Sequence, residues 1–292
     1  SREADVQALS WSKDTGRVAL SGVNPGDCVQ LVFSLAALAA DPQGSGVIGA
    51  SPQTIAATAG LWLWRPEHIS ADMQTTLRFV LPPGVQVSAP WPQPEPGRYV
   101  LDITAFQLPS RVVIGSFVPL SAPAEAGLPR LAVAILDGPR TASDSGVLRW
   151  LDAARRTHRQ VFQGATVPQV QIVVAPVPGG QRDPVSFGMA LRGGGAGIVL
   201  FLGSEATDEA LVGEWVAVHE LFHTGMPRLH SPAAWLYEGV TQYYTEVLRG
   251  RAGFLSPEMT WQRLASGFAR GRLGGSTRTL ASESALMGQT GA

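Results

Sequence analysis

Residues 214–223 read E-W-V-A-V-H-E-L-F-H, and the last five letters place two histidines four residues apart. Apolar residues recur around them at helical spacing, so the stretch predicts a helix with one buried face. Residues i and i+4 share a face of a helix, so His219 and His223 can both present a ring nitrogen to one ion. Glu220 lies between them and can act as general base on a water bound to that ion. The stretch therefore predicts a metal site.

A catalytic zinc needs a third protein ligand and an open position, and two residues are candidates. Glu238 lies in W-L-Y-E-G-V-T-Q-Y-Y, residues 235–244, in a predicted helix that begins near residue 231 and can pack antiparallel on the first. His230 is the other candidate. The pattern H-E-x-x-H-x-x-G-x-x-H would need glycine at 226 and histidine at 229, where the sequence has Met226 and Leu229. The residues thus favour Glu238 and leave His230 as a loop residue.

The composition bounds the class of protein. Of the 292 residues, 45% are hydrophobic and 15% charged, which is ample for a core and suggests about two domains. The 22 basic and 23 acidic residues give a net charge of −1, so nucleic acid is excluded as the main partner. The single lysine, Lys13, follows no glycine-rich loop, which excludes a P-loop. The single cysteine, Cys28, excludes an intrachain disulfide, and we expect it to be buried.

Location signals are few. The longest apolar stretch, residues 31–40, is about half of the ~20 residues that a membrane-spanning helix needs, so no transmembrane segment is expected. The sequence begins at Ser1 without an initiator methionine, which looks like a processed end. This favours a periplasmic or secreted bacterial protein.

The order of predicted elements divides the chain. Short apolar runs separated by Pro/Gly turns predict an antiparallel β-sandwich in the first 120 residues, with strands at 17–23, 29–35, 61–65, 75–81, 99–106 and 111–117. Residues 121–129 are rich in Pro and Ala and predict a linker. Strands are then expected at 130–136, 169–174 and 197–202, and helices at 144–163, 207–225, 231–248 and 256–270. The prediction is an α+β protein with a β-sandwich domain at 1–122 and a second domain at 123–292.

H-E-L-F-H followed by W-L-Y-E-G-V-T-Q-Y-Y resembles the gluzincin metallopeptidases. The resemblance is closest to the glycyl aminopeptidase family, whose second motif reads near W-x-x-E-G-F-T-x-Y-Y, and more distant to the alanyl aminopeptidase group. Residues 251–256 and 279–284 are also similar to the former family. The resemblance implies an N-terminal antiparallel β-sandwich followed by a thermolysin-like zinc metallopeptidase domain. It implies that His219, His223 and Glu238 bind Zn²⁺ and that Glu220 is the base.

The resemblance also bears on substrate binding. It implies that Gly193, Gly194 and Gly195 are an edge segment that hydrogen-bonds the substrate backbone, although glycines alone also suit a flexible turn. The segment lacks the glutamate that holds the free amine in the alanyl aminopeptidases, which leaves specificity for chain ends open. Relatives continue past the position of Ala292 through helices that carry a catalytic tyrosine. We therefore expect this chain to be C-terminally incomplete and a poorer catalyst than a longer form.

Two functions follow from these features. The first is a zinc-dependent metallopeptidase, aminopeptidase-like, that hydrolyses peptide bonds of a peptide or protein substrate. The alternative is a metallopeptidase-like protein that binds zinc with weak or no turnover and serves a binding or scaffolding role.

Overall fold

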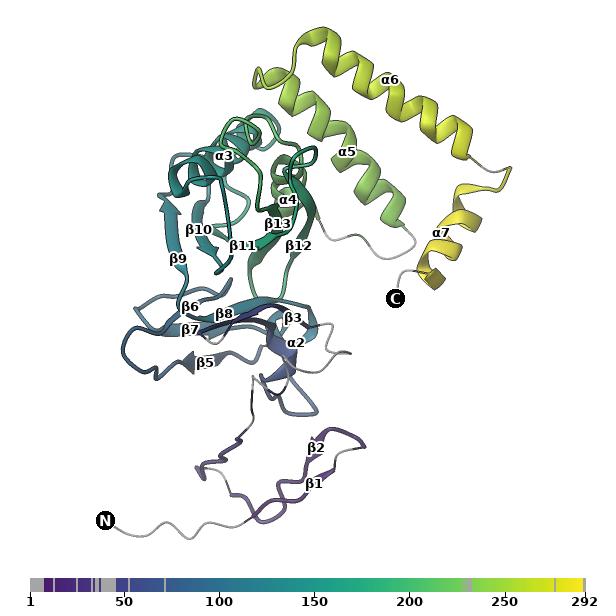
Figure 1. The fold of residues 1–292 in the computed structure, drawn as a ribbon. Coiled ribbons are helices and arrows are strands. Elements are labelled where there is room, and N and C mark those ends of the chain that lie inside the picture. Colours follow the sequence, from purple (N-terminus) through teal and green to yellow (C-terminus); the bar gives the residue numbers. More distant parts are fainter. Residues whose placement is uncertain are drawn as a thin grey trace. The chain divides into compact units, whose positions relative to one another are not determined.

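A computed structural model describes residues 8–12, 14–24, 26–32, 34, 37, 46–51, 53–70, 72–227, 229, 233–275 and 277–290. The chain divides into two compact units, residues 1–34 and 35–292. In the first unit, β1 (Trp11–Ser12) pairs antiparallel with β2 (Arg17–Val18) (Figure 1). The predicted strand at 17–23 is thus shorter, and residues 29–32 form no strand. Cys28 is exposed, which corrects the expectation that it is buried.

The second unit begins with two small antiparallel sheets. One has the order β3-β4-β8-β6, and the other pairs β5 with β7. Their bounds are Val47–Ser51 (β3), Thr54–Thr58 (β4), Thr75–Arg78 (β5), Gln86–Ser88 (β6), Arg98–Leu101 (β7) and Arg111–Gly115 (β8). Four aromatic rings of this part pack edge to face, with ring centroids 5.6–6.2 Å apart: Trp62, Phe79, Trp91 and Tyr99. Antiparallel strands are therefore confirmed in this part of the chain.

All four strands predicted in this region are shorter than expected or absent. The strands expected at 75–81 and 111–117 end at Arg78 and Gly115. The short helix η1 (Ala59–Leu61) and irregular chain occupy the place of the strand expected at 61–65. The strand expected at 99–106 ends at Leu101 and is followed by α2 (Thr104–Gln107). The Asp102 carboxylate accepts hydrogen bonds from the backbone N–H groups of Thr104 and Ala105 at 2.9 and 3.3 Å. This local capping favours a helical turn over extended chain.

A five-stranded mixed sheet follows, in the order β12-β13-β11-β10-β9. Its strands are β9 (Val118–Ala122), β10 (Arg130–Ile135), β11 (Gln169–Val177), β12 (Val185–Leu191) and β13 (Ala196–Gly203). The three central strands run parallel, whereas β9 and β12 lie antiparallel at the two edges. Residues 121–129 are therefore not a linker: they end β9 and turn directly into β10. The domain boundary predicted after residue 122 falls at the end of β9.

Helices α3 (Asp144–Thr157) and α4 (Val216–Gly225) cover one face of this sheet, and the four-stranded sheet packs on the other. The helices that complete this part of the chain are the short η2 (His158–Gln160), α5 (Ala234–Arg251), α6 (Pro257–Gly274) and α7 (Leu280–Thr290). Apolar residues of α3 and α4 share one buried cluster with β10, β11 and β13. A second cluster joins the opposite face to β4 and β8. Helix α5 packs on α4, and α6 packs on α5 on the side away from the sheet (Figure 1).

The chain is thus a mixed α/β protein with several antiparallel sheets, as predicted in outline. The helix expected at 207–225 begins later, at Val216, because residues 207–215 form turns. Ser256 and Pro257 begin α6 as predicted, with the Ser256 hydroxyl accepting from the Met259 N–H. The predicted helix start near residue 231 lies outside the described residues. Among the helices that are described, none is long and apolar enough to cross a membrane.

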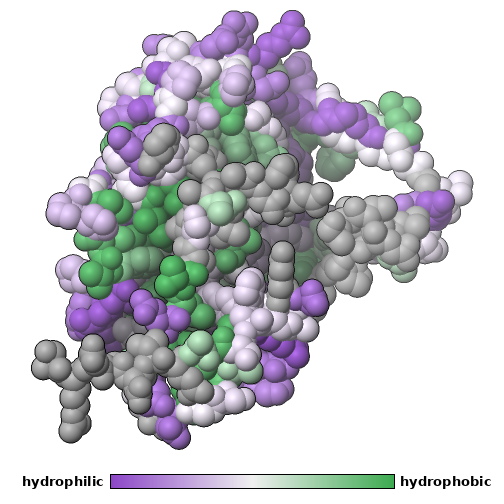
Figure 2. Space-filling model, turned by 60° about the horizontal axis from the view of Figure 1, so that its bottom comes forward, coloured by the Kyte–Doolittle hydropathy of each residue, from purple (hydrophilic) through white to green (hydrophobic). Residues whose placement is uncertain are grey.

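The surface carries both hydrophobic and hydrophilic residues. Figure 2 shows hydrophobic patches set among hydrophilic residues on the face that it draws. Trp215, Trp235 and Trp261 are among the large hydrophobic residues that remain exposed.

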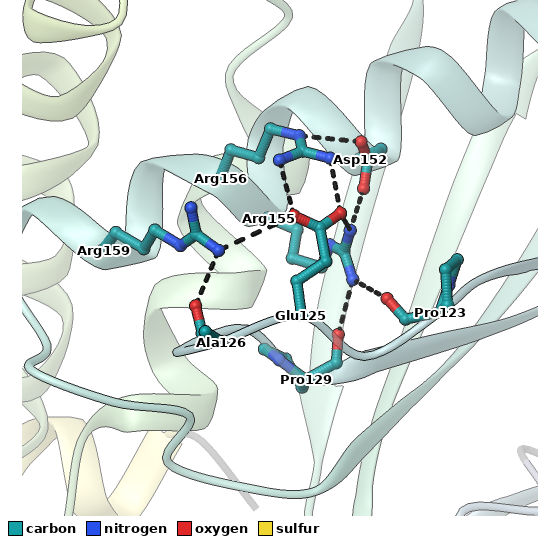
Figure 3. Close-up of polar contacts among 8 residues, drawn as sticks. All are labelled: Pro123, Glu125, Ala126, Pro129, Asp152, Arg155, Arg156 and Arg159. Atoms are coloured by element: carbon teal, nitrogen blue, oxygen red, sulfur yellow. Dashed lines mark hydrogen bonds and ion pairs between the residues drawn. The ribbon is translucent and has the colours of Figure 1, made fainter.

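A buried arginine fastens the β9–β10 turn to α3 (Figure 3). Arg155 is 1% exposed, and its Nη1 donates to the carbonyls of Pro123 and Pro129 at 2.7 and 2.8 Å. Its Nη2 donates to Glu125 at 3.2 Å and to Asp152. The guanidinium therefore pairs with two backbone carbonyls and one carboxylate that lie 26 or more residues away in the chain. It also pairs with a second carboxylate, Asp152, on its own helix.

Replacing Arg155 should be much more costly than replacing its exposed neighbour Arg159. Arg155→Met keeps an unbranched side chain but leaves buried acceptors unpaired, so we expect a loss of about 3–5 kcal/mol in the free energy of unfolding. Arg159→Met, at the exposed rim, should cost about 1 kcal/mol or less. Urea unfolding of the two variants measures both values. Equal losses of unfolding free energy in the two variants would contradict the inference that Arg155 links the β9–β10 turn to α3.

A buried histidine links η2 to α4. The His158 ring is 3% exposed, and its Nε2 donates to the Leu221 carbonyl at 2.5 Å. Burial lowers the pKa of His158 to about 4. His158 is therefore a buried structural residue at the start of η2.

This histidine makes stability depend on pH. Its folded pKa lies below the ordinary value, so the unfolded chain binds the proton first as the pH falls, and stability is lost between pH ~6.5 and ~4. When the pH is lowered from 7.5 to 5.0, the free energy of unfolding of the native protein should fall by about 2 kcal/mol more than that of His158→Gln. Glutamine retains a donor for the Leu221 carbonyl. Urea unfolding of both metal-free proteins at the two pH values provides the test. Identical pH dependence in the two proteins would refute the assignment.

Candidate active site

Helix α4 carries H-E-L-F-H and is held at both ends. At its start, Glu214 accepts hydrogen bonds from the N–H groups of Val216 and Ala217 at 2.8 and 3.4 Å. Burial raises the pKa of Glu214 to about 7. At its end, the Arg192 guanidinium donates to the carbonyls of His223 and, at 2.6 Å, Met226. A cation at the C-terminal carbonyls also complements the helix dipole.

Three ligand atoms from α4 and α5 converge on one point. The Nε2 atoms of His219 and His223 are 3.2 Å apart, and Glu238 Oε2 lies 3.3 and 3.4 Å from them. Two ligands bound at ~2.0–2.1 Å and at tetrahedral angles are ~3.3–3.4 Å apart, so the three separations fit a zinc ion. The donor set of two imidazoles and one carboxylate also suits zinc. The three residues predicted as ligands are thus brought together.

The protonation of these groups suits metal binding. The adjacent imidazoles of His219 and His223 lower the pKa of Glu238 to about 2, which keeps the carboxylate charged. Burial lowers the pKa of His223, which favours the neutral imidazole that can bind a metal. The Glu238 carboxylate therefore offers a negative charge to a divalent cation.

The two imidazole rings are also held from their other side. Thr245 Oγ1 lies 3.3 Å from Nδ1 of His219, and Thr241 Oγ1 lies 3.2 Å from Nδ1 of His223. Neither threonine was among the site residues predicted from the sequence. With Glu238 they follow the spacing i, i+3, i+7, which places all three on one face of a helix. That spacing is the signal that could have found them.

Aromatic rings pack on both histidines. Tyr237 stacks on His223 with ring centroids 4.2 Å apart and planes inclined by 19°. The Tyr237 hydroxyl lies 3.2 Å from Arg192 Nη2, which donates to it. Trp215 meets His219 edge-on at 5.6 Å. These contacts restrict rotation of the two rings.

A cavity of about 390 Å³ opens between β12, α4 and α5. It is lined by residues 186–190 of β12 and by Trp215, Val216, His219, Glu220, His223, Tyr237 and Glu238. Glu220 is 7% exposed, and burial raises its pKa to about 7, against an opposing hydrogen bond with the backbone of Ala190. The predicted base therefore lies in the same cavity as the ligand atoms without being one of them.

Glycine at position 188 makes room for Glu220. A Cβ atom at Gly188 would lie 2.7 Å from Glu220 Cγ and 2.5 Å from Val216 Cγ1. No strand was expected here, although residues 185–191, V-S-F-G-M-A-L, alternate large apolar with small residues. This period-2 pattern is the signal for β12, the strand that forms one wall of the cavity.

The three glycines predicted to bind substrate form the turn between β12 and β13. The Gly193 carbonyl accepts from Trp91 Nε1 at 2.9 Å, and the Gly193 N–H donates to Pro109. The Gly194 N–H donates to Thr104 Oγ1 at 3.1 Å, and a Cβ at Gly195 would lie 2.0 Å from the Pro90 carbonyl oxygen. These glycines pack on the first part of the unit and do not line the cavity. Their role in substrate binding stays a prediction, and His230 lies outside the described residues.

Comparisons with known proteins agree with the resemblance found in the sequence. Residues 227–288 match the M61 glycyl aminopeptidase family, and this stretch contains Glu238, Thr241 and Thr245. None of the curated proteins matches the chain. The fold is similar to the crystal structure of an aminopeptidase N family protein from Idiomarina loihiensis, with a TM-score of 0.51 and 16% identity. That similarity covers 70% of this chain and 38% of the other, so this chain spans well under half of that protein. The resemblance to a glycyl aminopeptidase-like metallopeptidase is confirmed.

Removing a proposed ligand should remove the metal. We expect about one zinc per chain in the native protein and almost none in His223→Ala or Glu238→Ala, since three protein ligands are needed. Elemental analysis after dialysis measures this, with circular dichroism to check folding. The control is His68→Ala, because His68 is exposed and lies outside the ligand cluster. Unchanged zinc in His223→Ala would show that the ligand set is wrong.

Proposed function

We propose that this chain is a zinc-dependent metallopeptidase of the gluzincin type, with a thermolysin-like catalytic domain and aminopeptidase-like chemistry. The observation that carries the proposal is the tetrahedral spacing of the ligand atoms of His219, His223 and Glu238, with Glu220 in the same cavity. The match of residues 227–288 to a peptidase family supports it independently.

Each residue of the site has a role in peptide hydrolysis. When bound, zinc supplies a Lewis acid that polarises the scissile carbonyl and lowers the pKa of its water toward ~7. His219, His223 and Glu238 would hold the ion. Glu220 would accept the proton of the attacking water at its carboxylate and return it to the leaving amine. A base with a pKa near the working pH performs both transfers well, and burial gives Glu220 such a value.

The wall formed by β12 supports a peptide as the substrate. β12 is an edge strand, paired with β13 on one side, and residues 186–190 line the cavity. An extended peptide can add to such an edge through main-chain hydrogen bonds and so lie beside the ligand atoms. We retain Gly193–Gly195 as further proposed contacts of the substrate backbone, on the resemblance alone.

Glu220→Gln separates the base from the ligands. The amide cannot accept the proton but has the same shape, so the variant should keep its zinc and hydrolyse peptides about 10²–10⁴-fold more slowly. Cleavage of a peptide library by the zinc-loaded protein, with and without chelator, measures this. The control is Glu209→Gln, because Glu209 is exposed and lies outside the cavity.

Two results would overturn the proposal. Near-native turnover by Glu220→Gln would exclude Glu220 as the base. If the native protein binds zinc but cleaves no peptide in the library, the binding or scaffolding role replaces catalysis.

A further inference from the structure

We propose that Thr241 and Thr245 are positioning residues, which fix the proton of each histidine on Nδ1 and thereby leave both Nε2 atoms free to bind the metal. The inference rests on the metal site of the proposed function.

The threonine hydroxyls lie where water cannot replace them. Thr241 and Thr245 are both 0% exposed, and His219 and His223 are 8% and 4% exposed. The Nδ1–Oγ1 distances are 3.3 Å for the pair His219–Thr245 and 3.2 Å for the pair His223–Thr241. Because the surroundings are dry, each Nδ1 depends on its threonine for a hydrogen-bond partner.

The hydroxyl protons are already committed. Thr241 Oγ1 donates to the Tyr237 carbonyl at 2.7 Å, and Thr245 Oγ1 donates to the Thr241 carbonyl at 2.7 Å. A hydroxyl has one proton, so toward the histidine each oxygen can only accept. The hydrogen bond therefore requires a proton on Nδ1 of His219 and of His223.

The position of that proton decides whether the ring can bind a metal. A neutral imidazole carries one proton, and with the proton on Nδ1 the lone pair of Nε2 is free. Both Nε2 atoms are the ones that face Glu238 Oε2. Without an acceptor at Nδ1, the proton can occupy Nε2 instead, and that form of the ring cannot be a ligand at this point.

One helix thus supplies both the third ligand and the partners of the other two. Glu238, Thr241 and Thr245 share one face of α5, and the pairs run in opposite order along α4, His223 with Thr241 and His219 with Thr245. This order follows from antiparallel packing of the two helices. A hydroxyl takes the place of the carboxylate or carbonyl that commonly orients such a histidine.

The test compares valine and serine at both positions. Valine has a similar shape without the oxygen, whereas serine keeps it. The dissociation constant of Zn²⁺ is measured by competition with a chromophoric chelator, on proteins whose fold is checked by circular dichroism. Thr241→Val and Thr245→Val should each weaken zinc binding about 10–100-fold, and the serine variants by less than about 3-fold. Alanine variants replace any valine variant that does not fold.

A matched control removes a buried hydroxyl elsewhere. Thr157 is 1% exposed and donates to the Ala154 carbonyl at 2.7 Å, as the two threonines do to their own helix, but no histidine accompanies that bond. Thr157→Val should leave zinc affinity unchanged. Loss of affinity in Thr157→Val equal to that in the α5 variants would mean that general loosening, not the histidine contact, weakens binding.

A second readout does not need the metal. The ¹⁵N spectrum of the metal-free protein reports which ring nitrogen carries the proton. Native protein should show Nδ1–H for His219 and His223, and Thr245→Val should lose this signature at His219 alone. If native protein binds no zinc, the proposed function fails while this spectrum still decides the inference. Folded valine variants with native zinc affinity, or native rings protonated at Nε2, would overturn it.

Discussion

The packing of α4 against α5 is the contact on which the site depends. Two of the proposed ligands come from α4 and the third from α5, and their atoms lie within 3.2–3.4 Å of one another. A shift of about 1 Å between the helices would destroy a set that metal bonds of ~2 Å must span. Both helices are held accordingly: Arg192 binds the end of α4, and Arg249 donates to the Gly213 carbonyl at 2.8 and 3.0 Å.

Buried polar groups cluster around these helices because they hold the chain in place. A buried polar group destabilises the core if it is left unpaired, and several of these groups bond to segments that are distant in the chain. Glu214 fixes the start of α4, and His158 bonds its Leu221 carbonyl. Glu220 differs: burial raises its pKa, and it lies in the cavity, where the proposed chemistry needs it. Structural and catalytic polar groups are distinguished by what they face, not by their residue type.

The five-stranded sheet brings the remaining wall to the site. β12 pairs antiparallel at the edge beside β13, and Gly188 lets α4 approach so closely that Glu220 fills the space of a side chain. The glycine turn after β12 is anchored to the first part of the unit by Trp91. The similar aminopeptidase N family structure shares only 16% identity with this chain. Similarity of fold at this level does not identify a substrate, so the function is inferred from the side chains of the site.

The sequence alone determined the residues whose relation is local. His219, Glu220 and His223 follow from the period of one helix, and Glu238 from a second motif and the failure of the His230 pattern. The sequence could not show that Thr241 and Thr245 face the two rings, that β12 exists as a wall, or that residues 121–129 are a tight turn in a sheet. Those features depend on contacts between residues far apart in the chain, such as Arg192 with His223 or Arg155 with Pro123. Helical spacing says which side chains share a face, and only tertiary packing decides what that face meets.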